Sequence, residues 1–360
     1  MGAARRAVAG TSPRGPAQTY AGSGVDLGGR ARALPALLRA ARYRAPPSHG
    51  RPVPAPGHYA GLVRLPGETI AVTTDTVGTK VLLAEATGRW EEVGEDLVAI
   101  NVNDLASVGA RPMAIVDTIL CGAADPRIFR TIGRGLRRGL AAARCSLVGG
   151  ETALVGEIVR SVDLGATAVG FMPGGRRPVL GERIGPGDQV LGIPSSGLHA
   201  NGFTLVRKLV REAALSLVRP RPGARLPLGR ELLAPTRTYS ALVDAVADLA
   251  GVVGLAHVSG GGVRNLVRLN RTVRFDLDTW PEPPSLFRWL QELGGIEERE
   301  MFQTFNMGVG FFIVVRPSAE AAVRRRLLRA GAGRVEVLGA VTHGRGVVLP
   351  NRGLTYLGYD

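Results

Sequence analysis

Cysteine, aromatic residues and long apolar runs are all scarce in this 360-residue chain. Its two cysteines, Cys121 and Cys145, are too few for a disulfide framework or a four-ligand zinc site. The five histidines are scattered along the sequence, so a structural metal is not expected. No apolar run reaches the length of about eighteen residues that a membrane helix needs. Residues 1–20 carry charge but no continuous apolar segment of the secretory kind, and the expected location is a reducing cytoplasm.

Lysine is also scarce, because only Lys80 and Lys208 contribute to the 45 basic residues. The formal net charge is nevertheless +15, since arginine supplies the rest. These arginines are spread along the chain, without a stacked aromatic platform or a nucleic-acid-reading motif, so a nucleic-acid partner is not expected. The arginine bias is more typical of genomic base composition or thermal adaptation. A positive field of this kind also favours small anionic substrates.

The length suits two domains, and segments typical of strands and helices alternate throughout. We expect an α/β (α+β) fold with a disordered tail (1–20), an N-terminal α/β domain (21–173) and a C-terminal α/β domain (174–360). The turn-rich segment 173–189 is the predicted boundary. Neither GxxxxGK[ST] nor GxGxxG occurs, so the two standard nucleotide-binding folds are not indicated. Strands are predicted at 68–75, 112–120, 145–150, 163–172, 190–196, 307–315, 334–342 and 346–350, and helices at 94–109, 127–143, 203–215, 236–251 and 318–331.

The predicted helix 94–109 carries polar residues within an apolar stripe. Leu97, Asn101, Asp104 and Val108 fall within one narrow arc at 100° per residue. A carboxylate there is costly unless something pairs with it. Asp104 either caps a loop or pairs with an arginine, or it meets a metal or a reacting group.

Two further acids stand at predicted strand ends in the same half. The stretch TTDTVGTK, residues 73–80, places Asp75 before Gly78 and Lys80, which indicates either a solvated strand end or a phosphate site. In GGETA, residues 149–153, Glu151 is predicted just past a strand. Asp75, Asp104 and Glu151 together offer the hard oxygen ligands that suit magnesium and a nucleoside triphosphate.

The second half contains SSGLHANG, residues 195–202, directly before a predicted helix. Its hydroxyl groups and backbone N–H groups are suited to a phosphate. His199 in the same loop is either polar surface or a general acid/base. HVSGGG, residues 257–262, is a second glycine-rich loop and a weak signal by itself.

Eight segments, in order, resemble the phosphoribosylformylglycinamidine cyclo-ligase family, also called aminoimidazole ribonucleotide synthetase, of purine biosynthesis. They are YAGSGVD, TTDTVGTK, EDLVAINVNDLASVGARP, LVGGETA, PSSGLHANGFTLVRK, LLAPTRTY, HVSGGGVRNLVR and EMFQTFNMGVGFFIVV. The resemblance implies an ATP-dependent ring closure of formylglycinamidine ribonucleotide, in which ATP activates the formyl amide oxygen. It also implies a cytoplasmic homodimer whose N-terminal domains pair, with the site between the domains and near the dimer interface.

Residue roles follow from the same resemblance. The implied catalytic residues are His199 and Asp104, and the implied ATP and phosphate contacts are Asp75, Gly78, Thr79, Lys80 and Asn101. The implied ligands of Mg²⁺ are Asp75, Asp104, Glu151 and Asp26. The implied substrate contacts are Ser195, Ser196, Gly197, Asn201, Gly260, Gly261, Thr304 and Asn306.

The chain departs from the family pattern in three places. No lysine precedes the GVD segment, GRPVPAPGHYAG replaces a glycine-rich loop, and Leu154, Val155 and Gly156 follow GGETA in place of an acid and a Pro-Gly turn. Two other functions therefore stay open at this point. One is a thiamine-monophosphate kinase-like activity of the same superfamily, and the other is a catalytically silent nucleotide-binding paralogue.

Overall fold

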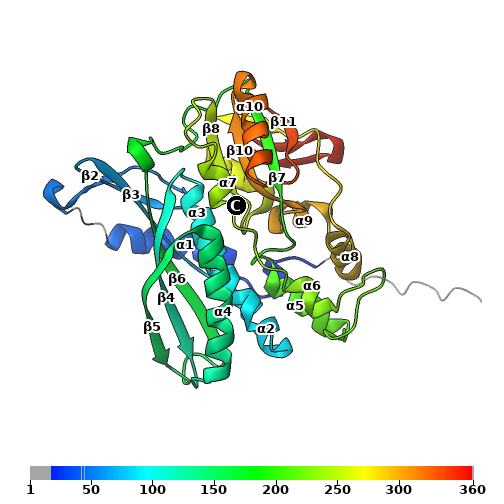
Figure 1. The fold of residues 1–360 in the computed structure, drawn as a ribbon. Helices are drawn as coiled ribbons and strands as arrows, with labels where there is room; N and C mark the ends of the chain where they lie inside the picture. The colour runs from blue at the N-terminus through cyan, green and yellow to red at the C-terminus, as the bar shows by residue number, and fades with distance from the viewer. Residues whose placement is uncertain (1–17, 42, 44, 359–360) are drawn as a thin grey trace, which may run out of the picture.

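Two β-sheets, one in each half of the chain, form the framework of the computed structural model, which describes residues 18–41, 43 and 45–358 (Figure 1). Helices pack on both sheets, so the expected two-part α/β fold is confirmed. Residues 1–17 of the predicted tail lie outside the described residues. Within the described residues, no helix is long and apolar enough to cross a membrane.

The N-terminal sheet has six strands in the order β1-β2-β3-β6-β4-β5. Neighbouring strands are antiparallel except β4 and β5, which run parallel and are joined through helix α4. Its strands are β1 (Arg51–Val53), β2 (Gly61–Leu65), β3 (Glu68–Thr76), β4 (Arg111–Cys121), β5 (Ser146–Leu154) and β6 (Val162–Phe171).

The C-terminal sheet has seven strands in the order β13-β12-β9-β11-β7-β10-β8. Every residue of β8 and β10 is buried, because helices and loops cover both faces of the sheet there. Its strands are β7 (Gln189–Pro194), β8 (Val252–His257), β9 (Val273–Asp276), β10 (Val309–Val315), β11 (Glu336–His343), β12 (Gly346–Leu349) and β13 (Leu354–Tyr356).

Helix α3 lies between the two halves and explains why they form one body (Figure 1). It packs on β3, β4 and β6 of its own sheet and against α7 and β8 of the C-terminal half. The other helices are α1 (Leu27–Ala40), α2 (Val81–Thr87), α4 (Pro126–Ala143), α5 (Phe203–Glu212), α6 (Leu228–Leu232), α7 (Ser240–Asp244), α8 (Ser285–Gly294), α9 (Glu298–Thr304) and α10 (Pro317–Arg329), and α3 itself spans Trp90–Ala106.

Helix α4 covers α3 and is held close to it by glycine. The Asp125 side chain caps the first turn by accepting from the Arg127 N–H, and Pro126 occupies the first helical position. A Cβ on Gly135 would stand 1.9 Å from the Glu91 carbonyl oxygen, so only glycine permits this approach.

The opposite face of the N-terminal sheet is open. Val72 and Val116 point to this face and are 38% and 40% exposed, and Val148 on the edge strand β5 is 65% exposed. Nearly every residue of β5 is exposed. Exposed apolar surface beside an unpaired strand edge is typical of an interaction surface.

Two expected elements differ from the structure. The predicted helix 236–251 is reduced to α7, and turns follow from residue 245. At its start, α3 side chains bind the backbone N–H groups of Thr236 and Tyr239 and hold those residues out of the helix. Glu151 lies inside β5 rather than past its end, because Gly149 and Gly150 continue the pairing with β4.

Candidate functional site

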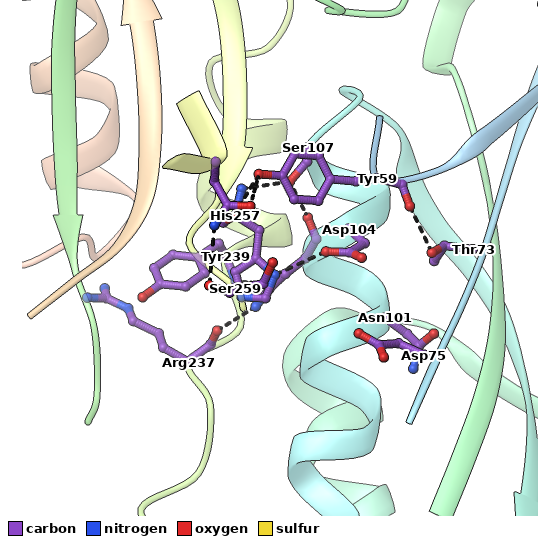
Figure 2. A network of polar contacts seen from close by, with 12 residues as sticks. Tyr59, Thr73, Asp75, Asn101, Asp104, Ser107, Arg237, Tyr239, His257 and Ser259 are labelled. Atoms are coloured by element: carbon purple, nitrogen blue, oxygen red, sulfur yellow. Dashed lines mark hydrogen bonds and ion pairs between the residues drawn. The ribbon is translucent and has the colours of Figure 1, made fainter. Parts of the chain in front are cut away.

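A carboxylate–imidazole pair joins the two halves of the chain at the C-terminal end of α3. The Oδ1 atom of Asp104 lies 3.1 Å from Nδ1 of His257, at the end of β8. The Asp104 side chain is 15% exposed and that of His257 is 1% exposed. The His257 backbone is fixed as well, since its N–H donates to Ser107 Oγ at 2.9 Å and its carbonyl accepts from the Tyr59 hydroxyl at 2.9 Å (Figure 2).

This arrangement orients the His257 ring. With Nδ1–H donating to Asp104, the lone pair of Nε2 is left as an acceptor. Nε2 is buried and has no hydrogen-bond partner among the described residues. A carboxylate that fixes the imidazole tautomer and leaves the far nitrogen free is the arrangement of a general base.

His199 lies beside this pair. Its ring centre is 6.1 Å from that of His257 and 6.1 Å from that of Tyr239. His199 is fully buried and its backbone is left-handed, with φ of 61°. Burial lowers the pKa of His199 well below its ordinary value, and the nearby His257 ring and Lys80 lower it further. The ring is therefore neutral near pH 7.

A second carboxylate approaches Asp104 from β3. Burial, and then the negative charge of Asp104, raise the pKa of Asp75 to about 6, although its side chain still reaches solvent. Arg30 on α1 is close enough to lower it partly. Asn101 on α3 is fully buried, and its Oδ1 atom has no partner among the described residues (Figure 2). These oxygens can receive a cation or a donor group of a ligand.

Lys80 lies inside the protein. Its ammonium is 2.6 Å from Asp96 Oδ2 and donates to the carbonyl oxygens of His199 at 2.8 Å and Ala234 at 3.0 Å. The Lys80 side chain is 0% exposed, so the ion pair and both hydrogen bonds lie away from solvent. The geometry therefore does not support direct phosphate binding by Lys80. The neighbouring Gly78 has a left-handed backbone, and the Thr79 hydroxyl lies 3.1 Å from that of Thr204.

The loop of the SSGLHANG segment is held by the segment before β10. Ser195 Oγ donates to Asn306 Oδ1 at 2.9 Å, and Asn306 Nδ2 donates to the Gly197 carbonyl at 2.8 Å. The Ser196 hydroxyl donates to the Pro235 carbonyl. Both serine hydroxyls thus direct their protons into the protein and leave only oxygen lone pairs for a ligand.

The remaining residues expected to contact substrate come from two places. The Asn201 side chain reaches Gly260, where an added Cβ would lie 3.1 Å from Asn201 Oδ1, and Gly261 has φ of 141°. The structure thus brings Asn201 and this glycine loop together. Thr304 is buried, and its hydroxyl donates to Glu300 at 2.9 Å within α9.

The four acids expected to bind metal do not form one cluster. Asp75 pairs across the sheet with Ala166, Asp117 and then Gly150, so about 14 Å separates β3 from β5. Glu151 follows Gly150 along β5. Because side chains alternate between the faces of a strand, it points to the opposite, open face. Asp26 caps α1 by accepting from the Gly29 N–H at 2.7 Å. Among the described residues, no group of three His, Cys, Asp or Glu side chains could hold a metal.

Several residues at this junction are absent from the sequence-based assignment. His257 is the main one, because the sequence marks it only as the start of a glycine-rich loop. Asp96, Asn103 and Ser107 are the others, and all three bind the C-terminal half. Their spacing of seven and four residues places them on one helical face, which is the signal that identifies them.

Comparison with known proteins agrees with the two-part fold. Residues 57–172 match the AIR synthase related protein N-terminal domain, and residues 185–350 match its C-terminal domain. The structure resembles a Thermus thermophilus protein (TM-score 0.64, 22% identity, 90% of this chain and 97% of that one). It also resembles the Aquifex aeolicus thiamine monophosphate kinase (TM-score 0.59, 15% identity, 90% and 97%). At such identities the likeness shows the fold alone, that of AIR synthase related proteins.

Sequence relatives are more specific. A phosphoribosylformylglycinamidine cyclo-ligase of Methanothermobacter thermautotrophicus is 42% identical over 83% of this chain and 88% of its own length. That of Thermococcus kodakarensis is 40% identical over 93% of this chain and 99% of its own length. The chain belongs to the phosphoribosylformylglycinamidine cyclo-ligase family.

Proposed function

We propose that the protein closes the imidazole ring of aminoimidazole ribonucleotide from formylglycinamidine ribonucleotide, with hydrolysis of ATP to ADP and phosphate. The observation that carries this proposal is the identity of 36–42% to relatives bearing the cyclo-ligase name over most of the chain. The site supports it because it combines two acidic groups, suited to a metal-bound nucleotide, with an oriented imidazole.

The reaction divides into two steps. The formyl amide oxygen first attacks the γ-phosphorus of ATP and releases ADP. An internal nitrogen of the substrate then attacks the activated carbon, the C–O bond breaks and phosphate leaves. The attacking nitrogen must lose a proton, and Nε2 of His257 is the acceptor that the structure offers, because Asp104 stabilises the resulting imidazolium. His199 is neutral and lies beside it, so it can position or stabilise the activated oxygen.

Mg²⁺ fits part of the site. Magnesium is usually bound through one or two carboxylates together with substrate phosphates, and Asp75 is a carboxylate close enough to Asp104 for the Asp104 charge to raise its pKa. The bound ion would neutralise the phosphate charge during transfer. Glu151 does not fit the same ion within one chain, because it points to the opposite face of the sheet, and the Asp26 carboxylate is engaged as the cap of α1.

The other contacts remain as the family resemblance assigns them, except Lys80. Gly78, Thr79 and Asn101 are proposed for the ATP phosphates. The proposed substrate contacts are Ser195, Ser196, Gly197, Asn201, Gly260, Gly261, Thr304 and Asn306. Of these, Thr304 donates its hydroxyl proton to Glu300, so like the two serines it offers only oxygen lone pairs.

A second copy of the chain is proposed to cover the open face of the N-terminal sheet. Val72 and Val116 give this face an exposed apolar surface, and the edge strand β5, which carries the exposed Val148, leaves one strand edge unpaired. Glu151 points to the same face, so dimerisation would bring it into an interface. Solution mass measured by light scattering tests this proposal.

The two other functions that the sequence leaves open are less well supported. Likeness to thiamine-monophosphate kinases rests on 15–20% identity and shows the fold. Incubation of the protein with magnesium, ATP and either formylglycinamidine ribonucleotide or thiamine monophosphate separates the candidates. We expect ADP release only with the first, in proportion to the aminoimidazole product. ADP release with thiamine monophosphate would contradict the proposal, and ATP binding without turnover would favour a silent paralogue.

A further inference from the structure

The most deeply buried charged pair of the described residues links the two halves of the chain. Lys80 follows β3 in the 3-10 turn η3 (Gly78–Lys80), and Asp96 lies on α3. Both side chains are 0% exposed, and the ion pair measures 2.6 Å. The ammonium also lies 5.3 Å from the centre of the Phe203 ring at the start of α5.

Nearly all other contacts of this pair go to the C-terminal half. Lys80 donates to the carbonyl oxygens of His199 and Ala234, and Asp96 Oδ1 accepts from both the N–H and the hydroxyl of Thr236, at 2.7 and 2.6 Å. A buried ion pair is weak evidence of stability by itself, because removing two charges from water costs about as much as their attraction returns. The Lys80–Asp96 pair therefore contributes more to the positions of the groups that it binds than to stability.

The geometry that it fixes is that of His199. A left-handed backbone is strained for a residue with a Cβ and persists only where the surroundings determine it. Lys80 binds the carbonyl oxygen of this very residue, while Asn306 and Ser196 tie the preceding part of the loop. The lysine is thus the contact that reaches His199 itself from the N-terminal half.

We propose that Lys80, held by Asp96, is a positioning residue that fixes the His199 loop against the N-terminal half, so that His199 lies beside the Asp104–His257 pair. This inference rests on the proposed function for its catalytic consequence. In this proposal the lysine of TTDTVGTK holds together the parts of the site that come from the two halves, and it does not contact phosphate.

The first test measures the loop directly and needs no activity. The double variant Lys80→Met/Asp96→Leu removes both charges together, so that neither is left buried alone. In hydrogen-exchange mass spectrometry of the full chain, we expect exchange in residues 195–201 to rise at least about tenfold, with β7 and β10 unchanged. Lys208→Met is the matched control, because this lysine also donates to a backbone carbonyl, of Gly22, but at the surface. Wild-type exchange in residues 195–201 of the folded double variant would overturn the proposal.

The second test asks whether Lys80 acts through His199. We expect the double variant to lower kcat by about tenfold to a hundredfold while KM for ATP changes less than about twofold. Added to His199→Ala, it should lower kcat no further, since the residue it positions is already gone. If the loss of kcat in the combined variant is instead the product of the losses in the double variant and in His199→Ala, Lys80 acts independently of His199 and the proposal is rejected.

The proposal can still be tested if the double variant does not fold or if the proposed function is wrong. If the double variant fails to fold, Thr236→Val removes only the hydroxyl donor to Asp96, and we expect a smaller rise of exchange, about threefold, in the same loop. No rise with this variant would count against the proposal. If the wild-type protein does not cyclise the substrate, the proposed function fails, whereas the exchange measurement still decides whether Lys80 holds the loop.

Discussion

The two sheets differ in how completely the chain covers them. In the C-terminal sheet, β8 and β10 are buried along their whole length. In the N-terminal sheet, α3 and α4 cover one face, while the other face and the edge strand β5 remain exposed. A sheet needs cover on each apolar face. The comparison shows that the C-terminal half covers its sheet within one chain, whereas the N-terminal half leaves apolar residues of one face exposed.

The candidate site lies where the two halves meet. Asp75 and Asp104 come from the N-terminal half, and His199 and His257 come from the C-terminal half. Helix α3 supplies both the acid and the contacts that dock the halves. The geometry of the candidate site therefore depends on the junction more than on either sheet alone.

The largest expected difference between the two sheets is in the free energy of unfolding lost when an apolar side chain is shortened to alanine. Phe312 in β10 is fully buried and its ring meets the edge of Trp280, so Phe312→Ala should lower the free energy of unfolding by about 3–5 kcal/mol. Val148→Ala on the exposed edge strand β5 should change the same quantity by less than about 0.5 kcal/mol in the isolated chain. Urea denaturation at protein concentrations low enough to hold the monomer gives both values. Equal losses would contradict the difference in cover.

Much of this contrast can be predicted from the sequence. The run GFFIVV is apolar without alternation, which is typical of a strand buried on both faces, and it is β10. Strand β8 is missed, because Val252 to His257 follow a segment whose alanines and leucines favour a helix. The start of the predicted helix 236–251 is wrong for a separate, tertiary reason, since Asp96 and Asn103 hold the segment before Ser240 in a non-helical conformation.

A charge on the open face should separate the proposed dimer. Val116→Glu places a carboxylate in the centre of the apolar surface and should raise the dimer dissociation constant at least about tenfold. The solution mass by light scattering should fall toward that of one chain. Arg345→Glu, a charge change in the turn between β11 and β12, serves as the control, with no expected change of mass. A monomeric wild-type protein would refute the interpretation of this face.

The site is less predictable than the fold, for physical reasons. Asp104 stands out because a carboxylate in an apolar stripe demands a partner, and the structure supplies His257. The burial of Lys80 could not be predicted from the sequence. A lysine shortly after a glycine is compatible both with a phosphate ligand and with a buried ion pair. Glu151 and Asp26 are acids in suitable motifs, but only the strand register shows that Glu151 points away from Asp75, and only the structure shows that Asp26 caps α1.

Burial of a neutral His199 should make stability depend on pH. The pKa of His199 is lowered in the folded chain and returns to about 6.5 on unfolding, so the unfolded chain binds the proton more strongly. Its contribution to stability is present above pH 6.5 and is lost as pH falls, by about 1–2 kcal/mol between pH 7 and 5. Denaturation of wild type and His199→Gln across this range measures the difference. Parallel curves for the two proteins would contradict a neutral, buried imidazole.

The smallest expected effect concerns the N-terminal acids. The pKa of Asp75 is raised to about 6, so its carboxylate is protonated below that pH and ionised above it. Affinity for magnesium-bound ATP should therefore rise from pH 5 to 7 with a midpoint near 6. In Asp104→Asn the like charge is gone, and the midpoint should move to lower pH. Calorimetric titration at several pH values gives both midpoints, and an unchanged midpoint would show that the two carboxylates are independent.

The central claim is that cyclisation takes place at the junction of the two halves, with the Asp104–His257 pair taking up the proton. The most direct measurement is aminoimidazole ribonucleotide formation and ADP release by wild type and His257→Asn under saturating substrates. We predict one ADP per product in the wild type and a loss of kcat of about 10²–10⁴-fold in the variant, with ATP still bound. Full activity of a folded His257→Asn protein would contradict the account.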